Sequence, residues 1–340
     1  MSDDKFLDDV LDVFGEGVLI TDSSEINAIS TGSISLDASI GIGGIPKGRI
    51  TEIFGSESTG KTTMALGMAK SALAYGGRAL YIDAENMLDY KLVEMIVGDE
   101  LDSGELVMLN PESAEDAFTM CEMGVNSGNF DIVILDSIGA LAPQKEKDDD
   151  FDKASVGQAA KLISKFLRRI SFKVKETDTA LVLLNQVRDK IGSFMGGFDT
   201  PGGHALKHFS ALRIALTKGK HITVGTGKDA VVVGVEVNFT VRKNKLAPPF
   251  RGFHFPIIFG KGIDTAMDYL EFCSMLGIIK KSGSYFKLDD ESLGQGRLVA
   301  ADSLRDNKVL LDKLAVMVYN TLDIENRGLV KEKEASNGDN

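Results

Sequence analysis

Residues 49–76 read RITEIFGSESTGKTTMALGMAKSALAYG. An apolar segment, a loop reading GSESTGKT (55–62) and an apolar run with helical spacing follow one another in this stretch. The loop fits G-x-x-x-x-G-K-[ST], whose glycines let backbone N–H groups turn inward around a phosphate and whose lysine reaches the β- and γ-phosphates. The start of the following helix adds a partial positive charge. The stretch therefore predicts a strand, a phosphate-binding loop and a helix, and a site for a nucleoside triphosphate.

A second segment, DIVILDS (131–137), is an apolar strand that ends in an acid. In such proteins this acid holds Mg²⁺ together with the loop's hydroxyl. We therefore expect Thr62 and Asp136 to be the metal ligands, although an acid here also suits the start of the next segment. The loop residues expected to contact the nucleotide are Gly55, Ser56, Glu57, Ser58, Thr59, Gly60, Lys61, Thr62 and Thr63.

Strand and helix signals alternate through the middle of the chain. Several of the strands are nearly continuous apolar runs, which is typical of parallel strands buried on both faces. The fold class predicted is α/β, with a mostly parallel central sheet and helices on both faces. The expected strands are 50–54, 79–83, 106–109, 132–136 and 181–185, and the clearest helices 62–75 and 113–125. Two further strands, 211–216 and 231–242, flank a turn region at 217–229 and are expected to pair antiparallel.

Two more strand ends carry polar residues. YIDAEN (81–86) places Glu85 where a carboxylate at the carboxyl edge of a parallel sheet faces the phosphate site. Glu85 is a candidate general base for the attacking water, or a solvent-exposed loop acid. LLNQVR (183–188) offers Asn185 or Gln186 as a sensor of the γ-phosphate, and the alternative is simple strand termination.

The charge of the chain is unevenly distributed. The 340 residues carry a net charge of −12, yet residues 153–220 hold 13 Lys and Arg against 4 Asp and Glu, a local +9. Within this stretch a helix over 156–175 puts Lys161, Lys165 and Arg168 on one side. Because screening confines charge interactions to about 10 Å, an acidic protein can still bind DNA through such a stripe. An ordinary solvated helix face is the alternative.

A glycine-rich stretch, GSFMGGFDTPGG (192–203), carries apolar side chains including Phe194 and Met195. Such residues pack under their own loop, contact a partner, or wedge between nucleic-acid bases. The residues themselves leave all three open.

Other classes are disfavoured. Cys121 and Cys273 cannot build a disulfide framework, which indicates a reducing, cytoplasmic setting. No segment looks like a signal peptide or a membrane span. The four histidines show no metal-ligand spacing with the two cysteines, so a zinc site is not expected.

Taken together, the sequence resembles the RecA family of DNA recombinases. The match covers about residues 25–300, in family order and at family-like spacing, and is far more specific than the phosphate loop. It runs through ISTGSISLD (29–37), GGIPKGRITEIFGSESTGKTT (43–63), YIDAEN (81–86), VILDSIGAL (133–141), LLNQVRDKIG (183–192), PGGHALKHF (201–209), RKNKLAPPF (242–250) and GQGR (294–297).

This resemblance implies an ATP- and Mg²⁺-dependent recombinase that forms helical filaments of itself on single-stranded DNA, pairs them with homologous double-stranded DNA and serves DNA repair and the SOS response. It implies that Glu85 is catalytic, that Gln186 couples the γ-phosphate to the following loop, and that Lys243 and Lys245 reach the neighbouring subunit's ATP. Asp89 and Gly260 are further nucleotide contacts. The implied DNA-binding residues are Val156, Lys161, Arg168, Arg188, Lys190, Gly192, Phe194, Met195, Gly202 and Gly203.

The resemblance also divides the chain. It implies a polymerisation arm over 1–30, with a helix at 5–14 and a strand at 18–21, and an ATPase core over 31–260. DNA-binding loops are expected at 146–157 and 192–203. A small α+β C-terminal domain follows over 261–325, and a polar tail over 326–340. Lys280, Lys281 and Arg297 are expected to engage duplex DNA.

This sequence departs from the family pattern near the adenine. A family tyrosine that stacks on the base lies a few residues after Leu-Asp, whereas Tyr90 here directly follows Asp89. The sequence leaves open which residue stacks. A helicase-type motor on the same core and a regulatory ATP-binding scaffold are the competing interpretations.

Overall fold

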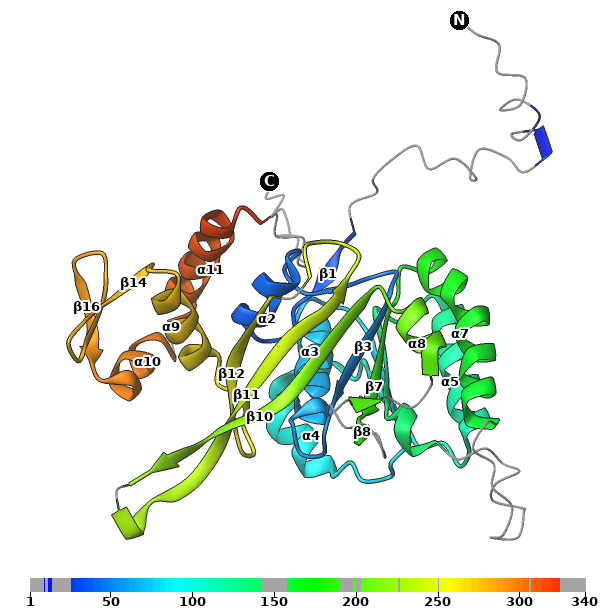
Figure 1. Cartoon of the computed structure of the whole chain (residues 1–340), viewed down its shortest axis with the longest axis horizontal. Coiled ribbons are helices and arrows are strands. Elements are labelled where there is room, and N and C mark those ends of the chain that lie inside the picture. The colour runs from blue at the N-terminus through cyan, green and yellow to red at the C-terminus, as the bar shows by residue number, and fades with distance from the viewer. Residues whose placement is uncertain are drawn as a thin grey trace, which may run out of the picture.

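Parallel strands that are apolar on both sides form the centre of the molecule, and antiparallel strands extend the sheet at one side (Figure 1). The computed structural model describes residues 26–141, 158–189, 198–199, 203–225, 227–249, 251–305 and 307–324, together with residues 9, 12 and 13. Within these residues the main sheet has the order β13-β12-β11-β10-β3-β7-β6-β4-β5.

The parallel part of the sheet comprises β3 (Ile50–Gly55), β7 (Ala180–Gln186), β6 (Ile132–Asp136), β4 (Ala79–Asp83) and β5 (Leu106–Leu109). β10 (Leu212–Val224) pairs parallel to β3 and antiparallel to β11 (Val231–Asn244), which leads to β12 (Gly252–Ile258) and β13 (Gly262–Ile263). The predicted α/β class with a mostly parallel sheet is therefore confirmed, and the expected strands begin and end within one residue of the observed parallel ones.

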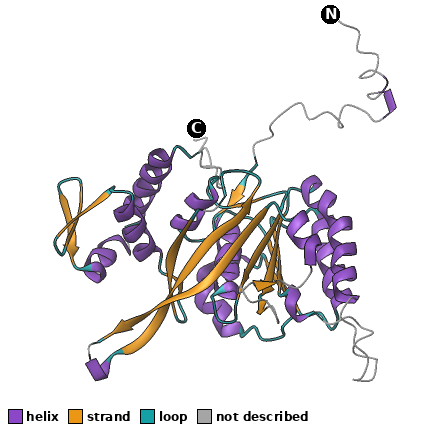
Figure 2. Cartoon of the chain, viewed as in Figure 1, coloured by secondary structure: helices purple, strands orange, loops and turns teal. Residues whose placement is uncertain are grey.

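Helices cover both faces of this sheet (Figure 2). On β6, Ile132 and Ile134 join the core under α3 (Lys61–Ala74) and α4 (Tyr90–Val97). Val133 and Leu135 join the opposite core, under α5 (Ala114–Ser127) and α7 (Gln158–Glu176). Successive strand residues point to opposite faces, so a continuous apolar run is what a doubly covered strand requires.

The prediction of a turn region over 217–229 was wrong. β10 continues to Val224 and β11 begins at Val231, so the two strands form a long hairpin that protrudes from the sheet (Figure 1). Irregular pairing between Lys218 and His221 absorbs the glycine between them, and the β-branched residues that follow resume the ladder. The short η4 (Gly227–Asp229) lies near the tip.

A smaller unit follows the sheet. It contains α9 (Thr265–Met275), the three-stranded sheet β14 (Ile279–Ser282), β15 (Tyr285–Leu288) and β16 (Glu291–Gln295), then α10 (Arg297–Arg305) and α11 (Lys308–Leu322). Its core includes Ile34 and Ala38 from α2 (Ile34–Ile40), which ties the unit to the start of the chain. At its base Asp264 caps α9 and receives two hydrogen bonds from Arg305, at 2.9 and 3.0 Å.

The remaining elements are short. They are β1 (Ala28–Ile29), β2 (Ile45–Pro46), η2 (Gly98–Ser103), η3 (Ile138–Ala140), β8 (Arg188–Asp189), β9 (Phe198–Asp199) and α8 (Gly203–Phe209). Residues 9, 12 and 13 are helical, in agreement with the helix expected at 5–14, while the strand expected at 18–21 and the tail over 326–340 lie outside the described residues. In the described part of the chain, no helix combines the length and the apolar character that crossing a bilayer requires.

Candidate functional site

The phosphate loop lies between β3 and α3, and both of its glycines are required by space. A Cβ on Gly60 would lie 2.4 Å from Ile257 Cδ1, and Gly60 has a φ of +80°. A Cβ on Gly55 would lie 2.4 Å from the carbonyl oxygen of Leu216. Thr59 closes the loop by donating to the Ser56 carbonyl at 2.9 Å. The N–H groups at the start of the 14-residue helix α3 are thereby directed at one point, which is an anion-binding arrangement.

Lys61 is the first residue of α3, and its side chain turns back over the loop. Its Nζ donates to the carbonyl oxygens of Gly55 at 3.1 Å and Ser56 at 2.9 Å. Burial lowers the pKa of the Lys61 ammonium, and the charges of Asp136 and Glu85 oppose that shift. A largely desolvated cation is therefore held where the phosphates of a nucleotide are expected.

The two expected metal ligands lie in contact. Thr62 Oγ1 donates to Asp136 Oδ2 at 2.7 Å. Burial raises the pKa of the Asp136 carboxyl, and the hydrogen bonds from Tyr81 and Thr62 act against that rise. A hydroxyl and a carboxylate side by side at the mouth of a phosphate loop are the oxygen ligands that Mg²⁺ prefers, so the residues fit this ion.

Tyr81 belongs to this site although the sequence reasoning missed it. Its hydroxyl donates to Asp136 Oδ2 at 2.7 Å, and the side chain is fully buried. On β4 it lies two residues before Asp83, which pairs with Asp136, so Tyr81 and Asp83 face the same way. The sequence signal that could have identified Tyr81 is its spacing of two residues from Asp83, together with its hydroxyl group on an otherwise apolar strand.

Glu85 receives two hydrogen bonds at one oxygen. Ser137 Oγ donates to its Oε1 at 2.7 Å, and Gln186 Nε2 donates to the same oxygen at 2.8 Å. Asn185, the alternative sensor, is fully buried and donates to Glu52 Oε1 at 2.9 Å. Of the two candidates the structure therefore brings Gln186 to Glu85, and it adds Ser137, which no sequence motif singled out.

The remaining residues expected to contact the nucleotide lie at more exposed positions than Lys61 and Asp136. Asp89 is exposed and caps α4, accepting from the Lys91 N–H at 2.9 Å. Tyr90 is 55% exposed. Gly260 has a φ of +72°, and a Cβ there would lie 3.2 Å from Met95 Sδ. Ser56, Glu57 and Ser58 are exposed on the loop, and Thr63 is half-buried.

Lys243 and Lys245 lie at the far end of β11 and just beyond it. Lys243 Nζ donates to the carbonyls of Lys207 at 2.7 Å and His208 at 3.0 Å, at the C-terminal end of α8. Burial lowers the pKa of Lys243, as do the nearby charges of Lys245 and Arg213. Lys245 is exposed. Within the described residues neither lysine forms a hydrogen bond or an ion pair with the phosphate loop of its own chain.

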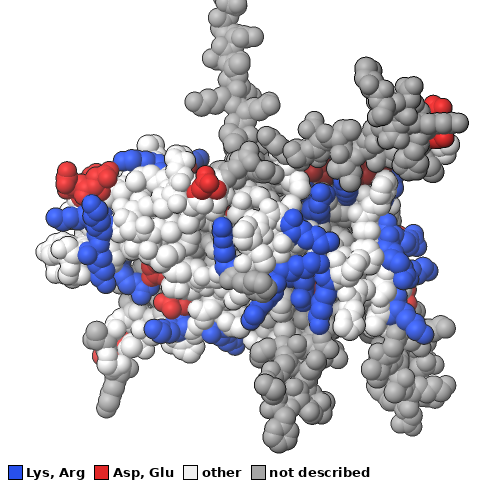
Figure 3. Space-filling view, turned by 45° about the horizontal axis from the view of Figure 1, so that its top comes forward, with Lys and Arg blue, Asp and Glu red and all other residues white. Residues whose placement is uncertain are grey.

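The basic stripe of α7 is exposed as expected. Ile163, Phe166 and Ile170 are buried, whereas Lys161 and Arg168 face solvent, as does Lys165. Figure 3 shows Lys and Arg gathered along the edge where α7 lies and again in the middle of this face. Of the other DNA candidates, Arg188 lies in β8 and Gly203 begins α8. Val156, Lys190, Gly192, Phe194, Met195 and Gly202 lie outside the described residues, as do the whole of 146–157 and most of 192–203.

Comparison with known proteins decides the family. The RecA N-terminal domain matches residues 4–264 and the RecA C-terminal domain residues 260–323. The chain belongs to the RecA family. It is 41% identical over 306 residues to Protein RecA of Aquifex pyrophilus, covering 88% of this chain and 86% of that one. It is 39% identical over 316 residues to Protein RecA of Thermus aquaticus, covering 91% of each, and 38% identical over 327 residues to that of Chlamydia felis, covering 94% and 92%.

The resemblance inferred from the motifs is thus confirmed. As a member of the RecA family, the protein is an ATP-dependent recombinase of DNA recombination and repair, and its ATPase activity depends on DNA.

Proposed function

We propose that this recombinase assembles as a helical filament on single-stranded DNA and exchanges strands with homologous duplex, with one ATP held by each phosphate loop at the border between neighbouring subunits. The observation that supports it best is the contact of Glu85 with Gln186 beside the phosphate loop. It connects the candidate hydrolytic residue to the end of β7, from which the chain runs on toward the second DNA-binding loop.

In the proposed nucleotide site, the backbone N–H groups of Gly55–Lys61 and the Lys61 ammonium bind the phosphates. Thr62 and Asp136 would hold Mg²⁺, which neutralises phosphate charge when bound. Glu85 takes the proton of the attacking water. Ser137 orients Glu85, because it donates to the same carboxylate oxygen as Gln186 and keeps that carboxylate fixed when Gln186 moves.

Gln186 is proposed to be the switch. It ends β7, with Val187 and then β8 (Arg188–Asp189) directly after it. A bound γ-phosphate competes with Glu85 for the Gln186 amide, and that movement reaches residues 192–203 through the five residues 187–191. Lys243 and Lys245 complete the neighbouring subunit's site. In the proposed movement the Lys243 ammonium would give up hydrogen bonds to two neutral backbone carbonyls, of Lys207 and His208, to reach the neighbouring subunit.

The DNA path is proposed to follow α7 and the two loops. Phosphate contacts by Lys161, Arg168, Arg188 and Lys190 need no sequence preference, since homologous pairing reads the sequence. Val156, Gly192, Phe194, Met195, Gly202 and Gly203 are proposed to line the path, and Asp89 and Gly260 to border the nucleotide. We also propose the division into an arm (1–30), a core (31–260), a C-terminal domain (261–325) and a tail (326–340), and a cytoplasmic location.

The test is ATP hydrolysis with and without single-stranded DNA, with electron micrographs of the same samples. Hydrolysis stimulated by single-stranded DNA together with filaments on that DNA supports the proposal. Unwinding of a forked duplex without homology would favour a helicase-type motor. ATP binding without stimulated hydrolysis would favour a regulatory scaffold.

A further inference from the structure

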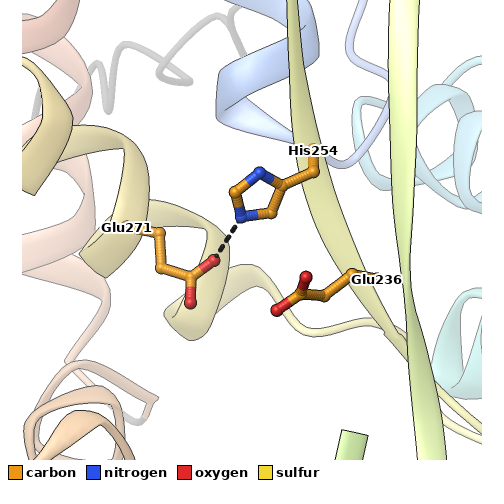
Figure 4. Close-up of side chains that lie close together, drawn as sticks. All are labelled: Glu236, His254 and Glu271. Carbon is orange, nitrogen blue, oxygen red and sulfur yellow. Dashed lines mark hydrogen bonds and ion pairs between the residues drawn. The ribbon is translucent and has the colours of Figure 1, made fainter. Parts of the chain in front are cut away.

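Three potential metal ligands meet where α9 packs against the antiparallel part of the sheet (Figure 4). Glu236 comes from β11, His254 from β12 and Glu271 from α9. One ligand atom of each lies within 4.8 Å of the others. His254 Nε2 and Glu271 Oε2 are 2.9 Å apart. The side chains are 17%, 29% and 13% exposed, in that order, so the cluster is sheltered yet open to solvent.

The spacing of these atoms suits a small divalent ion. Zn²⁺ binds carboxylate oxygen and imidazole nitrogen at about 2.0–2.2 Å and is tetrahedral, so two of its ligand atoms lie about 3.4 Å apart. The ligand atoms, now within 4.8 Å of one another, must therefore approach by at most about 1.4 Å. Both glutamate side chains have rotatable bonds that allow this, whereas His254 is held by stacking on Phe253, with ring centroids 4.3 Å apart.

A cation already occupies part of this position, namely the guanidinium of Arg297. Its Nη2 forms an ion pair with Glu271 Oε1 and lies 3.5 Å from Glu236 Oε1. Arg297 is 50% exposed, and such ion pairs contribute only about 0–1 kcal/mol. The two carboxylates of Glu236 and Glu271 carry two negative charges, and the Arg297 guanidinium balances only one of them. A divalent ion would balance both.

A buried carboxyl with an unpartnered oxygen lies on the same helix as Glu271. Asp268 lies one turn before Glu271 on α9 and is fully buried, and in the described part of the chain its Oδ1 has no hydrogen-bond partner. Its Oδ2 accepts from Ser33 Oγ at 2.8 Å. Histidines that bind a metal through one nitrogen usually donate the other N–H to a carboxylate, and we infer that Asp268 takes this role when the ion binds.

We propose that Glu236, His254 and Glu271 bind a divalent first-row transition ion in exchange with the Arg297 guanidinium. The ligand set of one imidazole and two carboxylates suits ions such as Zn²⁺ or Co²⁺, whereas Thr62 and Asp136 offer only oxygen. The ion fastens the sheet to the first helix of the C-terminal unit. It also releases Arg297, the first residue of α10, to solvent.

The first experiment titrates Zn²⁺ into the full-length protein without nucleotide by calorimetry, and follows Co²⁺ binding by its visible absorption. One ion per chain is expected. His254→Ala should weaken binding by at least about 100-fold. His221→Ala removes an exposed histidine of β10 and should leave binding unchanged. Equal affinity in the wild-type protein and Glu271→Gln, or no binding at all, overturns the proposal.

A second variant separates loss of the site from loss of folding. Arg297→Gln removes the competing cation and should tighten Zn²⁺ binding by about two- to fivefold. Misfolding cannot produce tighter binding. Asp268→Asn should weaken it by about tenfold through His254. Unchanged affinity in Arg297→Gln contradicts the exchange. Neither ATP nor DNA is present, so the outcome is independent of the proposed filament mechanism.

Discussion

The phosphate-loop edge and the junction with the C-terminal unit are both clusters of charged side chains, but they are assembled differently. At the first, the phosphate loop, the start of α3 and neighbouring parallel strands supply the groups: Tyr81 and Asp136 meet through strand register, and Thr62 reaches Asp136 from α3. At the second, Glu236, His254 and Glu271 come from two antiparallel strands and a helix. A site made by consecutive residues and a fixed sheet edge can be read from sequence, whereas one made by packing cannot.

The largest effect is expected where the phosphate-loop edge loses its buried cation. Lys61→Ala should lower ATP hydrolysis by at least about 10³-fold, because the backbone N–H groups alone do not balance the phosphate charge. Lys70→Ala, at an exposed position of the same helix, is the matched control. Steady-state hydrolysis with single-stranded DNA measures both. Near-normal turnover in Lys61→Ala would move the nucleotide site elsewhere.

Next comes the proposed base. Glu85→Gln keeps an oxygen that Ser137 and Gln186 can donate to, but removes the proton acceptor, so hydrolysis should fall by about 10²- to 10³-fold. ATP-dependent binding of single-stranded DNA should persist, which fluorescence anisotropy can follow. Glu94→Gln alters an exposed acid on α4 and should change neither. Equal hydrolysis in Glu85→Gln and wild-type protein would assign the base to another residue.

Lys61 and Glu85 also show how much of the site can be predicted from the sequence. The motif predicted the loop, the β3–α3 arrangement and the acids at the strand ends, because each follows from neighbouring residues. It could not predict Ser137 or Tyr81, whose roles depend on which strands are adjacent. The hairpin was misjudged since glycine and lysine over 217–229 suggested a turn, while pairing with β11 carried the strand on to Val224. His254 was judged by its spacing from cysteines, and its neighbours are glutamates distant in sequence.

Tyr81→Phe tests a contact of the phosphate-loop edge that depends on which strands are adjacent, namely the hydrogen bond from Tyr81 to Asp136. The ring and its burial remain, and the hydrogen bond to Asp136 Oδ2 is lost. The Mg²⁺ concentration needed for half-maximal hydrolysis should rise about tenfold, with kcat at saturating Mg²⁺ nearly unchanged. Tyr75→Phe, at the end of α3 and 43% exposed, is the control. A uniform loss of rate at every Mg²⁺ concentration would indicate a general packing role instead.

A smaller effect is expected on the basic stripe of α7. Lys161→Ala and Arg168→Ala should each weaken binding of single-stranded DNA several-fold and reduce the magnitude of the salt slope by about 0.7. Lys175→Ala changes an exposed lysine near the other end of the same helix and should leave the slope unaltered. The measurement is the affinity of each variant for single-stranded DNA at several salt concentrations, which gives the salt slope. An unchanged slope in both stripe variants would make this face a solvated surface.

The smallest expected effect is on how the melting temperature depends on pH, and it arises from two buried acids at the junction with the C-terminal unit. Burial raises the pKa of Asp37 to about 7 and that of Asp268 to about 6, from ordinary values of 3.8. Between pH 4 and 7 the folded protein therefore binds more protons than the unfolded chain, so the free energy of unfolding falls as pH rises through this window. Asp37→Asn abolishes one of these titrations and should flatten the decline of melting temperature between pH 5 and pH 7.5 by a few degrees, about 2–4 °C for each kcal/mol.

Asp131→Asn supplies the contrast for this last measurement. Burial acts to raise the pKa of Asp131, but the hydrogen bonds from Lys47 and the Arg78 N–H and the charge of Lys47 together outweigh it and lower the pKa, so the contribution of Asp131 is lost only as pH falls below about 4. This variant should melt at a lower temperature throughout, with the slope between pH 5 and pH 7.5 unchanged. If Asp37→Asn and Asp131→Asn shift the curve in the same way, the buried acids of the junction are not what makes its stability depend on pH. If only Asp37→Asn flattens the dependence of melting temperature on pH, the buried acids of the junction make the folded protein more stable as pH falls.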